Sequence, residues 1–221
     1  MPTNSYADQP AGARLLLIER DAILPILREL PDDDFDRPTA LPGWSVRDVL
    51  AHCAAALTMT ARGTAHGYTP AENQQDVDER RQWPIGRLLD ELTSGYDGAA
   101  DRIAAASGRL DLLALGEWTH GGDVREALGR PDAYASEGIE DALALFERLG
   151  RLARFEIPPT EVRLPGWVLH LGPLESSEGS SHNATLVAEV QTLVRMLAGR
   201  FRATDRYDLS GAEPAQYAMF G

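Results

Sequence analysis

Hydrophobic positions in the first two thirds of the chain recur every three or four residues, which is the spacing of one buried face of an α-helix. Short stretches rich in proline, glycine and aspartate interrupt the recurrence, and such stretches are typical of turns. The pattern therefore predicts a series of helices that each bury one face. The expected helices span residues 11–30, 44–60, 85–106, 112–128 and 136–155, with a shorter helix opening at the sequence TPAEN within 67–82.

Individual residues sharpen these expectations. Ser45 stands where an N-cap is needed, and Asp48 stands three residues later, where the reciprocal partner of a capping box belongs. Pro25 is expected to kink or divide the first helix, because proline lacks a backbone N–H and its ring clashes with the preceding turn. Gly95 and Gly98 lower the helix propensity of the segment that contains them.

The pattern changes after Pro158 and Pro159, where alternation of apolar and polar residues predicts a strand over 162–171. The chain is therefore expected to be an α+β protein, with a helical module over residues 1–157 and a small α/β module over 158–221. The second module is too short to build a large core alone. Its other expected elements are a Ser/Gly-rich loop at 174–183, a helix over 184–197 and a short strand at 207–210.

The helix expected at 112–128 carries ionisable residues in the middle of its apolar face. Glu117 and His120 are three residues apart, so their side chains can point the same way. The opposite side of the helix carries Arg125 and Glu126. Buried ionisable groups are costly unless they are paired or bound to a metal, so this face needs a partner elsewhere in the fold. The apolar residues that share the face are Leu113, Val124, Ala127 and Leu128.

Composition and charge narrow the classes of partner. The net charge of −13 disfavours nucleic acid and anionic membranes, which would repel the protein. The polar start of the chain and the lack of long apolar runs predict a soluble, cytoplasmic protein. Cys53 is the only cysteine, which rules out an intrachain disulfide and agrees with a reducing compartment. All 21 basic residues are arginine. This composition is typical of a GC-rich genome and leaves no lysine for a Schiff base.

His52 is the candidate partner for the pair on the other helix. It lies at the edge of the apolar stripe of its own helix, where a histidine is more often structural than a ligand. A helix bundle that turned the two helices toward each other would bring together His52, Glu117 and His120. Two nitrogen ligands and one oxygen ligand leave an open coordination position, which is typical of a catalytic Zn²⁺ site. The Glu-x-x-His spacing is frequent by chance, so the spacing is a weak signal.

Two segments carry a resemblance to a known family. LPGWSVRDVLAHCAAAL and EWTHGGDVREALGRP resemble the mycothiol-dependent maleylpyruvate isomerase-like family of the DinB-like superfamily. The later sequence LVRMLAGR is similar to the small C-terminal module of that family. The resemblance implies a DinB-like antiparallel four-helix bundle, a divalent metal that is usually zinc, and the actinobacterial thiol mycothiol as cosubstrate. The arginine-only composition agrees with an actinobacterial origin.

The resemblance assigns His52 and His120 as metal ligands. The family carboxylate falls on Gly116 here, and Glu117 is the next residue on nearly the same helix face. Asp123 is another candidate ligand, or a residue that supports His120 from outside the coordination sphere. A family member that has lost its metal is the alternative interpretation.

The function expected from the resemblance is a metal-dependent, mycothiol-dependent thiol transferase or isomerase that acts on a small electrophilic molecule. The thiol would serve as nucleophile, which leaves Cys53 as a core residue. Arg200 is our candidate for binding a substrate carboxylate, and an ordinary salt bridge is its alternative role. A non-catalytic binding or regulatory protein and a metal-dependent hydrolase are the other candidate functions. The sequence leaves open a monomer or a homodimer, and it suggests no partner for His66, His170 or His182.

Overall fold

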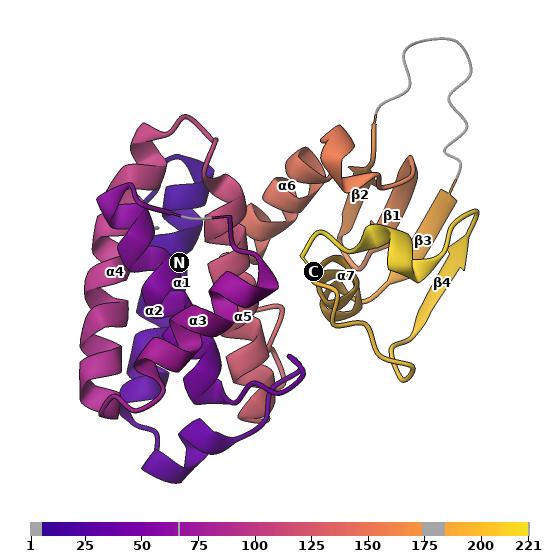
Figure 1. The fold of residues 1–221 in the computed structure, drawn as a ribbon. Coiled ribbons are helices and arrows are strands. Elements are labelled where there is room, and N and C mark those ends of the chain that lie inside the picture. The colour runs from indigo at the N-terminus through magenta and orange to yellow at the C-terminus, as the bar shows by residue number, and fades with distance from the viewer. Residues whose placement is uncertain (1–5, 66, 174–183, 221) are drawn as a thin grey trace. The chain divides into compact units, whose positions relative to one another are not determined.

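A computed structural model describes residues 6–65, 67–173 and 184–220 of the chain. The expected loop at 174–183 lies outside the described residues, as do His66 and His182. The chain divides into two compact units, residues 1–138 and 139–221 (Figure 1). Within the described residues, no helix is long and apolar enough to cross a membrane.

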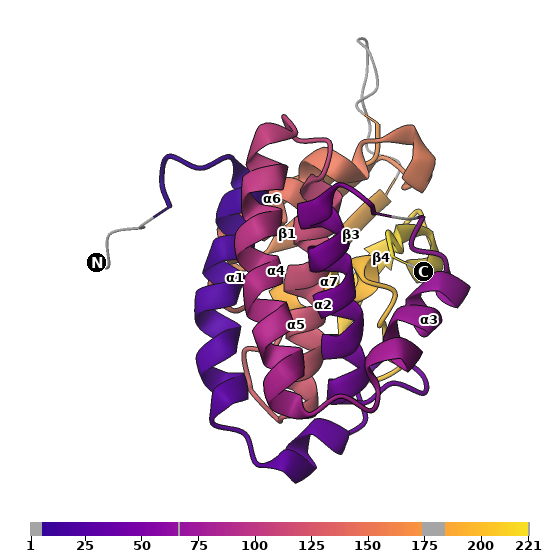
Figure 2. The same ribbon diagram turned by 60° about the vertical axis from the view of Figure 1, so that its left-hand side comes forward.

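The first unit is a helix bundle, and its helices lie where the hydrophobic spacing predicts them. Two views show the long helices packed side by side (Figures 1 and 2). Pro25 does not divide the first helix, which continues past it to Arg28. The elements are α1 (Ala11–Arg28), η1 (Asp32–Asp36), α2 (Val46–Arg62), α3 (Pro70–Arg80), α4 (Ile85–Ala105) and α5 (Asp111–Ala127).

Close packing of α2 against α4 explains why α4 contains Gly95 and Gly98, which lower its helix propensity. A Cβ atom at Gly95 would lie 2.8 Å from the Cβ of Leu57, and one at Gly98 would lie 2.7 Å from the Cβ of Ala61. Both distances are shorter than real Cβ contacts allow, so only glycine permits this approach. The lower helix propensity of glycine is therefore offset by burial of α2, whose residues from Ala51 to Leu57 are all buried.

The second unit contains a mixed sheet with the strand order β2-β1-β3-β4. β1 pairs antiparallel with β2 and parallel with β3, and β3 pairs antiparallel with β4. The fold is thus α+β, as the sequence predicts. The elements are α6 (Ile139–Gly150), η2 (Ala153–Phe155), β1 (Thr160–Leu164), β2 (Trp167–Leu171), β3 (Ala184–Ala188), α7 (Val190–Leu197), β4 (Tyr207–Ser210) and η3 (Pro214–Tyr217).

Two sequence predictions in this unit are wrong. The single strand expected over 162–171 is the hairpin of β1 and β2, which turns at Gly166 with a φ of 84°. The helix expected over 184–197 is helical only in its second half, because its first half forms β3. Its residues alternate in burial and pair with strands on both sides, β1 and β4. The strands that pair with β3 come from distant segments of the chain. Their pairing decides between helix and strand, because the local apolar spacing is compatible with both.

Helix α6 is shorter than the helix expected over 136–155, and it packs against β2. The Glu147 carboxylate accepts a hydrogen bond from the backbone N–H of His170 in β2, and Glu147 also pairs with Arg151. This helix therefore groups with the sheet, whereas the boundary expected at residue 158 assigned it to the helical module.

Candidate functional site

Helix α5 is buried on nearly all sides, although its sequence suggests an apolar face and a polar face. Glu117 is 3% exposed, and Arg125, which the sequence assigns to the polar side, is only 2% exposed. The helix packs against both α1 and α2. Charged groups of α5 therefore lie inside the bundle, where each needs a compensating partner.

His52 of α2 and His120 of α5 lie together, as the sequence argument expects. Their ring centroids are 5.2 Å apart and the ring planes are nearly perpendicular, at 82°. His52 is buried, whereas the side chain of His120 is 15% exposed. One histidine is thus enclosed, and the other lies at the boundary between the core and solvent.

Asp123 supports His120 one turn further along α5. Its Oδ2 lies 3.1 Å from Nδ1 of His120, and its Oδ1 accepts a 2.6 Å hydrogen bond from the hydroxyl of Tyr134. The Asp123 side chain is fully buried, so its position is well defined. This contact engages Nδ1 and leaves Nε2 as the imidazole nitrogen that faces away from Asp123. Asp123 thus contacts His120 directly, and its role as a ligand or as a support of His120 stays a prediction; Tyr134 is a contributor that sequence reasoning missed.

Gly122 makes room for Tyr134. A Cβ atom at Gly122 would lie 2.3 Å from Cδ1 of the Tyr134 ring, so a side chain there would displace the ring. Gly122→Ala is therefore expected to destabilise the protein by about 1–3 kcal/mol, the usual effect of overpacking. Helix propensity alone predicts the opposite sign.

The matched control for this prediction is Gly86→Ala. Gly86 is an exposed residue of α4, and a Cβ atom added there would have no neighbouring atom within 4 Å. Alanine at this position is therefore expected to stabilise the protein by about 0.5–1 kcal/mol. Urea unfolding of both variants measures the two effects. A stabilised Gly122→Ala variant would contradict the packing role of that glycine.

Glu117 lies inside the bundle, in contact with the thiol of Cys53. Burial raises the pKa of Glu117 to about 8; the hydrogen bond with Cys53 opposes this shift and the charge of Glu19 adds to it. Oε2 of Glu117 is buried without a hydrogen-bond partner among the described residues. Burial also raises the pKa of Cys53 well above its usual range, so this thiol is a neutral core residue.

A second buried layer contains an ion pair that the sequence analysis did not predict. Glu19 of α1 is fully buried, and both its oxygens accept hydrogen bonds from Nη2 of Arg125, at 2.9 and 2.8 Å. Burial raises the pKa of Glu19 to about 7 against the opposing attraction of Arg125. Burial lowers the pKa of Arg125, but attraction to Glu19 outweighs it and the net shift is upward. A pKa of about 7 leaves Glu19 partly protonated at neutral pH, so the pair is fully charged only at higher pH, whereas Arg125 stays charged throughout.

The buried charges do not balance around Glu117. Glu19 and Arg125 neutralise each other, whereas no positively charged group among the described residues contributes to the pKa of Glu117. An ionised carboxylate in that position is costly, so Glu117 requires either a proton or a cation beside it. The electrostatics of the bundle therefore fit either a protonated Glu117 or a cation beside its carboxylate.

Aromatic side chains surround His52 on its other sides. The Trp44 ring lies 5.4 Å away at an angle of 51°, and the Tyr68 ring lies 6.5 Å away, edge-on at 89°. The Tyr68 hydroxyl lies 3.3 Å from the hydroxyl of Thr60 in α2. Trp44 belongs to the quoted motif, but no sequence signal marked Tyr68, which is in a connecting segment.

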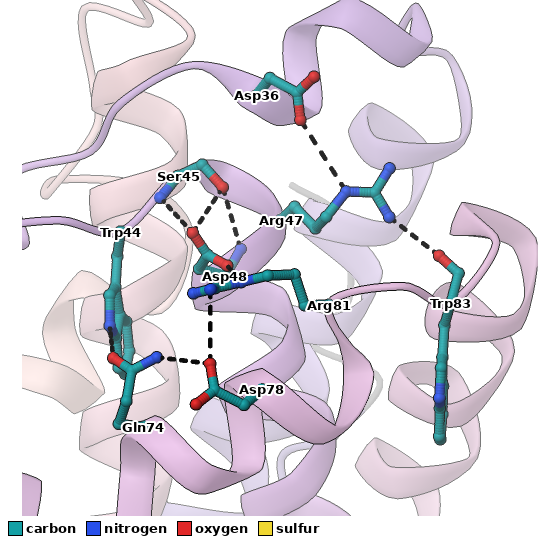
Figure 3. A network of polar contacts seen from close by, with 9 residues as sticks. All are labelled: Asp36, Trp44, Ser45, Arg47, Asp48, Gln74, Asp78, Arg81 and Trp83. Carbon is teal, nitrogen blue, oxygen red and sulfur yellow. Dashed lines mark hydrogen bonds and ion pairs between the residues drawn. The ribbon is translucent and has the colours of Figure 1, made fainter. Parts of the chain in front are cut away.

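Polar contacts at the start of α2 attach α3 to this region (Figure 3). Ser45 and Asp48 form the expected capping box. Arg81, just after α3, lies 3.4 Å from a carboxylate oxygen of Asp48. Gln74 of α3 accepts a 3.1 Å hydrogen bond from the indole N–H of Trp44. The capping box thus begins α2 and also helps to anchor α3 next to Trp44.

The fit of these residues to a metal rests on donor chemistry and on the unpartnered oxygen of Glu117. Among the described residues, no group of three or more His, Cys, Asp or Glu side chains is arranged to hold a metal ion as it stands. His52, His120 and Glu117 nonetheless supply the two nitrogen donors and one oxygen donor that suit zinc. Ligation by all three would require side-chain movement, so the metal site stays a prediction.

Arg200 lies in the second unit, just after α7. Its backbone N–H donates to the carbonyl of Arg195, and its guanidinium donates to the carbonyl of Ala198. The side chain is half-buried within this unit. Its role in binding a substrate carboxylate stays a prediction.

Comparison with known proteins identifies a matching family and similar solved structures. Residues 16–131 match the family described as the mycothiol maleylpyruvate isomerase N-terminal domain. A crystal structure of the mycothiol-dependent maleylpyruvate isomerase superposes with a TM-score of 0.58 at 14% identity, covering 97% of this chain and 98% of that chain. A mutant of that enzyme with a histidine replaced by alanine superposes with a TM-score of 0.57 at 13% identity and the same coverage. No curated protein sequence matches.

Proposed function

Because the chain belongs to the mycothiol maleylpyruvate isomerase N-terminal domain family, we propose that it is a metal-dependent isomerase or thiol transferase that uses mycothiol. The substrate in this proposal is a small electrophilic molecule, and one version of the proposal gives that molecule a carboxylate group. The observation that carries the proposal is the convergence of His52 and His120, together with Glu117, a buried carboxyl group of the same helix as His120 that has no positively charged neighbour among the causes of its pKa shift.

In this proposal His52, Glu117 and His120 hold a divalent metal, with zinc as the first candidate. The metal, when bound, supplies a Lewis acid that keeps the thiol of the cosubstrate deprotonated. Glu117 balances the charge of the cation from within the bundle. Asp123 fixes the ring of His120 through Nδ1, so that Nε2 is available for ligation.

Two further roles in this proposal are the nucleophile and the group that binds the substrate. Cys53 is buried with a raised pKa, which makes it a poor nucleophile and leaves that role to the cosubstrate. Arg200 is proposed to bind a carboxylate of the substrate, for which a guanidinium fork is well suited.

The experiment that tests this function measures metal content and thiol dependence together. Protein purified without chelator is expected to contain about one equivalent of divalent metal by elemental analysis. It is expected to isomerise maleylpyruvate, or to add mycothiol to an electrophile, only when mycothiol is present. Hydrolysis of a substrate without any thiol would indicate a hydrolase instead. Metal-free protein without any thiol-dependent activity would overturn the proposal.

A binding protein without metal chemistry is the second candidate function. It is favoured by Gly116, which occupies the position of the family carboxylate, and by the lack of a ready three-ligand group among the described residues. Such a protein would carry Glu117 in its protonated form, because the raised pKa permits a neutral carboxyl group at pH 7.

Glu117→Gln distinguishes these candidates through stability as well as binding. In metal-free protein the folded state keeps a proton on Glu117 up to about pH 8, whereas the unfolded chain releases it near its ordinary value of 4.5. The folded state then binds more protons than the unfolded state, so stability falls as pH rises through this window, by at most about 1.4 kcal/mol per pH unit.

The glutamine variant is expected to lose this part of the pH dependence and to be more stable than wild type at pH 8 without metal. With zinc present the order is expected to reverse, because a neutral amide is a poorer ligand than a carboxylate. Urea unfolding from pH 5 to pH 8, with chelator and with zinc, measures both effects. An unchanged pH slope in chelator would show that Glu117 is not the buried titrating group.

A further inference from the structure

Tyr68 is held in a backbone conformation that a residue with a side chain rarely adopts. Its φ is 53°, in the left-handed region, and Gly67 immediately precedes it. Glycine adopts this region without steric penalty, whereas tyrosine does not. Residues strained in this way cluster at functional sites, where the side chain is needed in one place. The place of this ring is edge-on against His52.

Trp44, which precedes His52 in the sequence, also packs against its ring and is held in place by hydrogen bonds. Its backbone N–H donates to the carbonyl of Leu41, in a turn where Gly43 has a φ of 81°. Its indole N–H donates to Gln74, and the Gln74 amide donates in turn to Asp78 at 2.9 Å (Figure 3). The orientation of this indole therefore depends on α3, a helix that contributes no ligand to the site.

Helix α3 determines the position of both rings. Thr69, the residue after Tyr68, is the N-cap of α3 and forms a capping box with Glu72. The side-chain amide of Asn73 donates to the carbonyl of Tyr68 at 3.3 Å. The two aromatic residues are far apart in sequence, yet both make hydrogen bonds to side chains of the same helix.

We propose that Trp44 and Tyr68 are positioning residues that fix the imidazole of His52 in the orientation in which it faces His120, with α3 holding both rings in place. A histidine ligand requires a defined ring orientation. The Asp123 carboxylate fixes the orientation of the His120 ring, whereas packing against the rings of Trp44 and Tyr68 fixes that of His52. The consequence for catalysis rests on the proposed metal-dependent function, but the orientation itself is a property of the metal-free protein.

The test compares Trp44→Leu and Tyr68→Asn with two controls. Asparagine tolerates the left-handed backbone, so Tyr68→Asn removes the ring without adding strain. Tyr68→Phe keeps the ring and is the conservative variant. Trp83→Leu is the matched control for indole loss, because the Trp83 ring stacks on Arg80 and Arg87 at the other end of α3.

Two readouts are used, and neither is activity. The first is the affinity for Co²⁺ and the visible absorption spectrum of the Co²⁺-loaded protein, which reports ligand geometry. The second is the ¹⁵N chemical-shift pair of the His52 ring in the metal-free protein at constant pH, assigned by its loss in His52→Asn. The ¹⁵N shifts report the tautomer, so a ring held among the same neighbours is expected to keep one tautomer-specific pair, whereas a ring that samples several surroundings is expected to exchange between tautomers and give averaged or multiple signals.

Trp44→Leu and Tyr68→Asn are expected to weaken Co²⁺ binding about 10–100-fold, the usual effect of residues that orient a ligand, and to average the His52 signals. Tyr68→Phe and Trp83→Leu are expected to match wild type in both readouts. Unchanged His52 signals in the two ring-deleted variants would overturn the inference, as would equal effects in Trp83→Leu. Wild-type protein that binds no Co²⁺ would overturn the proposed function, and the metal-free signals would still decide the positioning role. If Trp44→Leu does not fold, Tyr68→Asn alone decides in the same way.

Discussion

His120→Ala is expected to reduce zinc affinity by about 100-fold or more and to abolish thiol-dependent turnover. Even residues that only orient a ligand contribute 10–100-fold to metal affinity, so loss of a ligand is expected to cost at least as much. Zinc is also expected to raise the thermal midpoint of wild type but not of the variant, because a metal that binds only the folded state stabilises it. Competition with a chromophoric chelator measures the affinity.

The controls separate ligation from a general effect of losing histidine. His52→Ala is expected to behave like His120→Ala, since the two rings lie 5.2 Å apart in the bundle. His170→Ala removes a histidine of β2 in the second unit, and it is expected to retain wild-type zinc affinity. Wild-type zinc content in His120→Ala would exclude this residue as a required ligand.

Arg125→Met is expected to destabilise the protein by about 3–5 kcal/mol at pH 8, which is typical of removing one partner of a buried pair. The substitution leaves the carboxylate of Glu19 fully buried without a balancing charge. Without the arginine, Glu19 takes up a proton more readily, and its pKa in the folded state rises further above the unfolded value. The folded state then binds the extra proton, so the deficit is expected to shrink as the pH falls toward 5.

Two comparisons check the origin of this effect. Adding Glu19→Leu to Arg125→Met is expected to recover most of the lost stability, because replacing both partners of a buried pair by apolar residues is often neutral. Arg37→Met breaks the exposed pair of Arg37 with Asp34 and is expected to cost less than about 1 kcal/mol. Urea unfolding at several pH values measures all of these. A double variant as unstable as Arg125→Met would contradict the electrostatic explanation.

The positions of the bundle helices could be read from the sequence because their signals are local. Apolar residues at helical spacing and the capping box of Ser45 and Asp48 involve neighbours within a few residues. The approach of His52 to His120 could also be anticipated, since each shares a helix face with apolar residues that must be buried. Local pattern failed at 184–197, where an apolar spacing compatible with a helix is used partly as a strand.

Contacts between distant segments were decided only by the tertiary structure. Arg125 looks like a residue of the polar side of α5, and only the approach of α1 brings Glu19 to meet it inside the bundle. Gly121 and Gly122, next to His120, are weak helix formers. Glycine is needed at both positions because Glu19 and Tyr134 occupy the space that a side chain would fill. Tyr68 lies in a segment without periodicity, so its contact with His52 has no sequence signature.

The sequence by itself therefore determined the α+β class, most helix positions and the identity of the histidines that meet. Helical spacing and caps are encoded within a few residues of one another, and burial of an apolar face follows from them. The partner of a buried charge, the pairing of a strand and the orientation of an imidazole each depend on which segments pack together. Which segments pack together is determined by the free energy of the whole fold, so only the tertiary structure decided these three features.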